Sequence, residues 1–151
     1  MDIVSHGLWG SIVFGRGNRR SFWRAFLFGV APDLLSFGPF FLSMLLGLTP
    51  RLQFSQEPPD PAAIPSYVYA LYNFTHSAFA FVALFLILWV LFRRPIWEMM
   101  AWGLHIALDI FSHSYQFFPT PFLWPLSDFT VDGVPWAHPE VFFPNVALLV
   151  V

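Results

Sequence analysis

Two histidines and an aspartate recur at intervals of four residues, at His105, Asp109 and His113, within a largely apolar run. Side chains four residues apart lie on the same face of an α-helix, so these three groups point in one direction. Imidazole and carboxylate groups are ligands of Zn²⁺ and of other divalent cations. The chain has no cysteine, which excludes thiolate ligands. The spacing therefore predicts that one helix supplies much of a metal site and that other helices bring the remaining ligands.

The composition is typical of a protein that lies in a membrane. Of the 151 residues, 57% are hydrophobic and 11% are charged, and the mean hydropathy is +0.62. Soluble domains carry about 25% charged residues, and a short one buries too little of its chain to cover this much apolar surface. We therefore expect an integral membrane protein. The net charge of −2 argues against a nucleic-acid partner.

Long and short apolar segments predict the helices that must position the polar groups. Three segments are long enough to cross a hydrocarbon core about 30 Å thick. Two further segments are too short, which indicates half-helices, or at the C-terminal end a helix that continues beyond Val151. We expect one all-α membrane domain over residues 1–151. The predicted spans are residues 22–48, 67–92 and 96–115, and the short segments are residues 3–14 and 141–151.

The arginines predict the orientation of these spans. A group of four arginines lies at the start of the first span, and Arg93 and Arg94 lie between the second and the third. Alternating spans place both groups on one side of the membrane, which the positive-inside rule makes cytoplasmic. The acidic loops at 49–66 and 116–140 then face outward, where Arg51 is the exception. The N-terminus lacks the basic region of a secretory signal.

Ionisable residues from four segments are expected at similar depths in the membrane. With a rise of about 1.5 Å per residue, their depths are roughly 13–20 Å from the helix ends. An aspartate at the centre of a span costs about 2.5–3.5 kcal/mol on insertion scales, so such residues mark functional sites. A shared divalent cation would compensate for this cost. The converging residues are Asp2, His6, Asp33, His76, His105 and Asp109, whereas His113 is expected nearer the external face.

Two other interpretations account for part of this pattern. A buried histidine often serves only as a hydrogen-bonded packing residue, which applies most readily to His76. Histidines on membrane spans also hold haem or other pigments as axial ligands. Pigment binding would leave Asp33 and Asp109 without a role, so the metal site explains more of the sequence.

Five short motifs follow one another along residues 1–130. They are Asp2-x-x-x-His6, Gly29-x-x-Pro32-Asp33, His76-Ser77, His105-x-x-x-Asp109 and Thr120-Pro121-x-x-x-Trp124-Pro125-Leu126-Ser127. In order and spacing they resemble the YdjM-like family of membrane-bound metal-dependent hydrolases. The resemblance implies a bacterial inner-membrane protein that binds zinc in a manner likened to zinc-dependent phospholipase C. It marks as metal ligands Asp2, His6, Asp33, His76, His105 and Asp109, to which the four-residue spacing adds His113.

Two functions are therefore expected from the sequence. The first is a metal-dependent hydrolase that acts on a membrane lipid or another membrane-embedded ester, with Asp33 as the general base. The alternative is a non-catalytic membrane subunit, in which the polar cluster fixes helix packing and the aromatic loop at 116–140 docks a larger complex.

Overall fold

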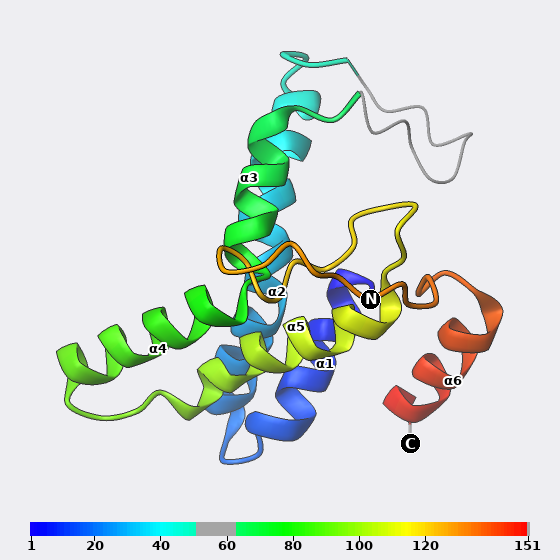
Figure 1. Ribbon diagram of the computed structural model, residues 1–151. Helices are drawn as coiled ribbons and strands as arrows, with labels where there is room; N and C mark the ends of the chain where they lie inside the picture. The colour runs from blue at the N-terminus through cyan, green and yellow to red at the C-terminus, as the bar shows by residue number, and fades with distance from the viewer. Residues whose placement is uncertain (51–62, 151) are drawn as a thin grey trace.

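The computed structural model describes residues 1–50 and 63–150, and these residues form an all-α structure, as predicted (Figure 1). The centre of the predicted loop at 49–66, including Arg51, lies outside the described residues. A short 3-10 turn, η2 (Trp97–Met99), precedes the fifth of six α-helices in the described part of the chain. The six are α1 (Ile3–Phe14), α2 (Arg19–Leu45), α3 (Ser66–Thr75), α4 (Ala78–Phe92), α5 (Met100–Ser112) and α6 (Pro139–Val150).

The first two helices form a hairpin in which the two backbones approach closely. Asn18 caps α2, because its side-chain oxygen accepts hydrogen bonds from two backbone N–H groups of the first turn. A Cβ atom on Gly29 of α2 would lie 2.6 Å from the carbonyl oxygen of His6 in α1. A residue with a side chain could not occupy this position without moving the helices apart. Glycine therefore brings His6 against α2, one turn before Asp33.

The second predicted span is two helices, α3 and α4, which meet at an angle of 61°. At this break a backbone carbonyl and a backbone N–H group form hydrogen bonds with other elements instead of within the helices. Trp102 of α5 donates its indole N–H to the carbonyl oxygen of Thr75 over 2.8 Å, and the N–H of Ala78 donates to the carbonyl oxygen of Phe122 over 2.9 Å. The break is thus held in place by α5 and by the loop that follows it.

The helices differ in length from the predicted spans. Among the described residues, α2 is the one helix long and apolar enough to cross a membrane, and α3 with α4 makes a second if the bent pair is one span. α5 has 13 residues, a rise of about 20 Å, so it is shorter than the predicted third span and shorter than a hydrocarbon core. α1 has the bounds predicted for residues 3–14, and α6 corresponds to the short segment predicted at 141–151.

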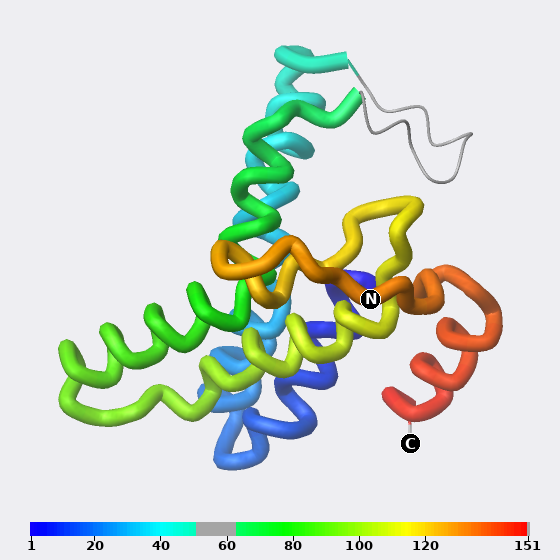
Figure 2. The backbone as a smooth tube through the Cα atoms, in the orientation of Figure 1, coloured from blue at the N-terminus to red at the C-terminus, as the bar shows by residue number. Residues whose placement is uncertain are grey.

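Two apolar clusters hold these helices together. One packs α3 against the C-terminal part of α2 and includes Phe40, Tyr72 and the loop residue Phe118. The other packs α4 against α5 and includes Phe81 and Trp102. Figure 2 shows the C-terminal part of α2 running with α3 away from α4 and α5, whereas the N-terminal part of α2 packs beside α5, and the loop after α5 crosses near the junction. The polar residues described below come from the helices that meet there.

Candidate metal centre

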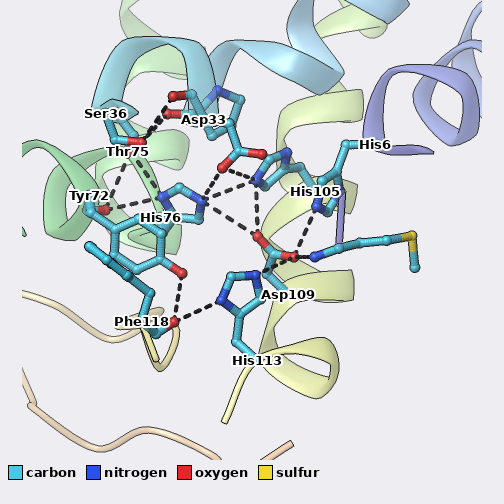
Figure 3. Close-up of polar contacts among 12 residues, drawn as sticks. His6, Asp33, Ser36, Tyr72, Thr75, His76, His105, Asp109, His113 and Phe118 are labelled. Atoms are coloured by element: carbon cyan, nitrogen blue, oxygen red, sulfur yellow. Dashed lines mark hydrogen bonds and ion pairs between the residues drawn. The ribbon is translucent and has the colours of Figure 1, made fainter. Parts of the chain in front are cut away.

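Four of the predicted residues lie together in the described part of the chain: Asp33 from α2, His76 from the break after α3, and His105 and Asp109 from α5 (Figure 3). One ligand atom from each lies within 4.8 Å of the other three. His76 Nε2 is 3.0 Å from His105 Nε2, and Asp109 Oδ2 lies 3.1 Å from His105 Nε2 and 3.5 Å from His76 Nε2. Asp33 Oδ1 lies 3.5 Å from His76 Nε2 and 3.7 Å from His105 Nε2.

The second ring nitrogen of each histidine faces a backbone carbonyl oxygen. His105 Nδ1 is 2.7 Å from the carbonyl oxygen of Gly29, and His76 Nδ1 is 3.2 Å from that of Tyr72. A carbonyl oxygen only accepts hydrogen bonds, so the Gly29 contact assigns the ring proton of His105 to Nδ1 and leaves a lone pair on its Nε2. His76 Nδ1 also lies 3.0 Å from the hydroxyl oxygen of Thr75, which can donate or accept, so both tautomers of His76 fit its surroundings. When both rings carry their proton on Nδ1, as metal ligation through Nε2 requires, the two Nε2 lone pairs are directed at the two carboxylates and at each other.

With both Nε2 atoms unprotonated, this arrangement is repulsive unless a cation lies among the four groups. The side chains of His76, His105 and Asp109 are 0% exposed, and that of Asp33 is 13% exposed. Asp109 Oδ2 has no hydrogen-bond partner in the described part of the chain. Asp109 Oδ1 has the Met1 ammonium and the Ser112 hydroxyl as partners, but a buried oxygen such as Oδ2 without a partner costs about 1–3 kcal/mol, because it has lost its hydration. The cluster thus has the burial and the unmatched lone pairs expected of a cation site.

The distances fit a tetrahedral ion. Nitrogen and oxygen ligands lie about 2.0–2.2 Å from Zn²⁺, which separates ligands in a tetrahedron by roughly 3.3–3.6 Å. The five contacts among the four side chains are 3.0–3.7 Å. Two imidazoles and two carboxylates also suit a borderline divalent cation. The cluster could therefore hold a metal ion.

Two further predicted histidines lie on the other side of Asp109. His6 Nε2 is 2.9 Å from Asp109 Oδ1, and the His6 ring stacks on His105 with ring centroids 3.6 Å apart. His113 Nε2 is 3.4 Å from the same oxygen, although the sequence placed this residue nearer the external face. α5 ends at Ser112, and the extended backbone of His113 turns its ring back toward the cluster. The ammonium group of Met1 also contacts Asp109 Oδ1.

Asp2, which the resemblance marked as a ligand, serves as the N-cap of α1. Its Oδ1 accepts a hydrogen bond from the N–H of Ser5 over 2.9 Å, and its Oδ2 accepts one from the Ser5 hydroxyl over 2.5 Å. Both carboxylate oxygens are thus used within the first turn of the helix. Asp2 does not belong to the group of four residues whose ligand atoms converge.

Substitution of Asp2 separates capping from metal binding. Asp2→Asn should keep both the metal content and the stability of the wild type, because asparagine also accepts the bond that caps the helix. Asp2→Ala should lower the free energy of unfolding by about 0.5–2 kcal/mol and leave the metal content unchanged. Metal analysis and thermal unfolding of the purified proteins measure both effects. Loss of metal from the Asp2→Asn protein would show that the carboxylate is a ligand after all.

The sequence analysis missed the groups that orient the histidines. These are backbone carbonyls of Gly29, Tyr72 and Phe118, the last of which accepts a bond from His113 Nδ1 over 2.9 Å. A carbonyl has no signature in the sequence, since every residue carries one. Glycine inside an apolar helix is a usable signal in the sequence. Because it destabilises the helix, its presence indicates that a neighbouring backbone packs closely there.

A cavity of about 640 Å³ adjoins the cluster. Asp33 and His113 form part of its wall, and Leu34, Phe37 and Phe41 of α2 contribute apolar surface. The loop after α5 lines it as well, with Phe117 and Trp136 among the contributing residues. The cavity therefore has a largely apolar lining that includes polar side chains at the cluster.

Fold and site together define a class: an all-α protein with one or two helices of membrane-spanning length and a buried His/Asp cluster that could hold a metal ion. The comparisons with known proteins add no narrower assignment. No protein family, no curated protein and no solved structure matches the sequence. The function must therefore be argued from the site itself.

Proposed function

We propose that this protein is a membrane-embedded, metal-dependent hydrolase that acts on a lipid ester or a similar ester in the bilayer. The observation that carries the proposal is the convergence of two imidazole Nε2 atoms and two carboxylates beside a largely apolar cavity. The resemblance of the five sequence motifs to the YdjM-like family supports the same reading. It also supports a bacterial inner-membrane location with the arginine-rich loops in the cytoplasm.

The side chains of the cluster differ in exposure, and this suggests different tasks. His76, His105 and Asp109 are fully enclosed and are suited to holding the ion. Asp33 is 13% exposed and lies on the cavity wall, where its carboxylate can accept a proton from a water molecule as general base. With Asp33 acting as base, His76, His105 and Asp109 would hold the ion and leave the fourth position for water, whose pKa a divalent ion would lower to about 7.

The cavity supports an amphipathic substrate. A polar ester group would lie beside Asp33 and His113, and an apolar chain would follow Leu34, Phe37 and Phe41 along α2. The substrate would then bury apolar surface at roughly 25 cal/mol per Å² if it came from water, and less if it came from lipid. The polar groups at the inner end would fix which bond lies beside the cluster.

The exposed apolar surface supports the membrane location. Leu86, Ile87, Val90 and Leu91 of α4 are all exposed, and they form a continuous apolar surface. Soluble monomers rarely expose large contiguous apolar patches, whereas lipid tails cover such a surface without cost. We propose that α2 and the bent pair α3–α4 lie in the bilayer and that the shorter helices pack beside them.

The proposal is tested with the full chain reconstituted in phospholipid vesicles that contain a fluorogenic ester lipid. Hydrolysis should depend on added Zn²⁺ and should stop when the metal is removed by a chelator. Asp33→Asn should lower the rate by about 10²–10⁴-fold, the usual contribution of general acid–base catalysis. Asp128→Asn, a change in an exposed loop residue outside the cavity lining, is the control and should keep the wild-type rate.

Hydrolysis that continues after complete removal of metal would contradict the proposal. A protein that binds metal but hydrolyses no ester, and that co-purifies in stoichiometric amounts with a larger assembly, would favour the non-catalytic subunit.

A further inference from the structure

We propose that the cavity beside the cluster takes an ester lipid with an uncharged, hydroxyl-bearing head group, of the acylglycerol type, and rejects lipids that carry a phosphate. The proposal rests on the hydrolase function proposed above and narrows its substrate to one class of lipid. It differs from the phospholipid substrate that a likeness to phospholipase C would suggest. The observation that carries it is the set of charges on the cavity wall.

The described residues that line the cavity supply two carboxylates, those of Asp2 and Asp33, and no guanidinium group. The ammonium group of Met1 also lies at the wall, but it is paired with the buried carboxylate of Asp109. Proteins neutralise phosphate groups mainly with arginine, lysine and metal ions, and this chain has no lysine. An anionic head group would therefore find no side chain with a free positive charge on the described part of the wall.

A divalent ion in the cluster would leave no surplus of positive charge. The ion would bring two positive charges, and the Met1 ammonium brings a third. The carboxylates of Asp2, Asp33 and Asp109 bring three negative charges. The site is then neutral as a whole, and a phosphate would add an unpaired negative charge in a largely apolar cavity, where such a charge is costly. An uncharged head group avoids this cost.

The uncharged side chains of the wall suit an acylglycerol. Ser114 and Gln116 line the cavity, and hydroxyl and amide groups can both donate and accept hydrogen bonds. The hydroxyl and ester groups of an acylglycerol need partners of both kinds. Leu34, Phe37 and Phe41 offer apolar surface for the acyl chain.

The arginines of the described chain lie at the other end of α1. Residues 1–3, where α1 begins, line the cavity, whereas one group of arginines lies in the turn after α1 and the first turns of α2, and a second lies between α4 and η2. Ser21 donates a hydrogen bond to Glu98 over 2.9 Å, so the two groups share one end of the molecule (Figure 1). All are exposed, where they can contact phosphate groups of the bilayer surface. They are Arg16, Arg19, Arg20, Arg24, Arg93 and Arg94.

The test is competition between two lipids that differ only in the phosphate. A 1-O-alkylglycerol and its 3-phosphate carry an ether bond in place of the ester, so a hydrolase does not cleave them. Each competes with a fluorescent 1-O-alkylglycerol for the full chain in detergent micelles at pH 8, where histidine is ordinarily neutral. We expect the alkylglycerol to bind at least about 10-fold more tightly than its phosphate, both with added Zn²⁺ and after chelation.

Leu34→Arg should remove this preference. Leu34 lines the cavity and is 51% exposed, so an arginine there can pair with the phosphate. The affinity for the phosphate should rise by at least about 10-fold, and that for the alkylglycerol should stay within about threefold. Leu35→Arg is the matched control, because Leu35 is 50% exposed in the same helix but does not line the cavity. A folded Leu34→Arg protein with the wild-type preference would overturn the cavity as the binding site.

The wild-type comparison tests the proposal even if Leu34→Arg prevents folding. Equal or tighter binding of the phosphate would overturn it, as would failure of both lipids to displace the fluorescent one. Tighter binding of an alkyltrimethylammonium would also overturn it, by showing selection of a cationic head group. Binding needs no hydrolysis, so an inactive protein that selects the alkylglycerol would refute the hydrolase and support the uncharged ligand. Hydrolysis of phosphate-bearing esters in preference to acylglycerols would do the reverse.

Discussion

Replacement of Asp109 by asparagine should abolish metal binding by the whole centre. Asp109 contacts His76 and His105 through one oxygen and His6 and His113 through the other. Asparagine has nearly the same shape, but it removes the negative charge and turns a donor NH₂ group toward acceptor lone pairs. Loss of groups that merely orient metal ligands already costs 10–100-fold in affinity, so we expect a loss of at least about 100-fold here.

The Asp109→Asn protein should still fold, because the amide can donate hydrogen bonds to lone pairs that need a cation in the wild type. Metal analysis and thermal unfolding, each with and without chelator, measure the two effects. Chelation should destabilise the wild type, since an ion at 100 times its dissociation constant stabilises the fold by about 2.7 kcal/mol. The variant should not respond to chelator. Asp128→Asn, in the exposed loop, is the control. Wild-type metal content in Asp109→Asn would refute the centre.

Gly29→Ala should be strongly destabilising although it adds one methyl group. The new Cβ would lie 2.6 Å from the carbonyl oxygen of His6 and 3.1 Å from the Cα of Gly7, and backbone atoms cannot move aside as a flexible side chain can. Overpacking of this kind costs about 1–3 kcal/mol, and separation of α1 from α2 would add to it. The same shift would displace the Gly29 carbonyl that orients His105, so metal affinity should fall together with stability.

Gly38→Ala is the matched control for this substitution. Gly38 lies in the same helix, and an added Cβ would meet nothing within 4 Å. Alanine gains about 0.5–1 kcal/mol over glycine in a helix, but its Cβ is crowded by the ring of the following Pro39, so the two effects oppose each other and stability should change by less than about 1 kcal/mol. Thermal unfolding of both variants in the same detergent gives the comparison. Equal stability of the two proteins would contradict the close approach of α1 and α2.

The bounds of the helices could be predicted where the composition of the chain changes. α1 has the predicted bounds because a polar cap precedes it and the Gly15–Asn18 turn follows it. The break between α3 and α4 was not predicted, because Thr75, His76 and Ser77 interrupt the apolar run only briefly. The backbone groups at the break form hydrogen bonds with Trp102 and Phe122, which are distant in sequence. Ser77, which caps α4 by accepting a bond from the N–H of Ala80, was the one local signal.

The site residues could be predicted to the extent that helix periodicity places them. His105 and Asp109 share a helix face, which their spacing of four predicts. The ionisable residues of the other helices were expected beside them, because charged groups in a membrane are costly unless they are paired. His113 lies closer to the cluster than predicted because α5 ends at Ser112, three residues before the predicted end of the span, and His113 itself has an extended backbone. Asp2 is both a good ligand and a good helix cap. Periodicity cannot distinguish these roles, and the structure places both of its oxygens on Ser5.

The unequal exposure of the four clustered side chains has a kinetic consequence. Asp33 alone among them reaches the cavity surface, so an ion held by the cluster would load and leave past this carboxylate. Any molecule lodged in the cavity would then block that route and prolong the residence of the ion. Exchange of radioactive zinc should accordingly slow down when an amphipathic molecule saturates the protein, with no change in the number of ions bound.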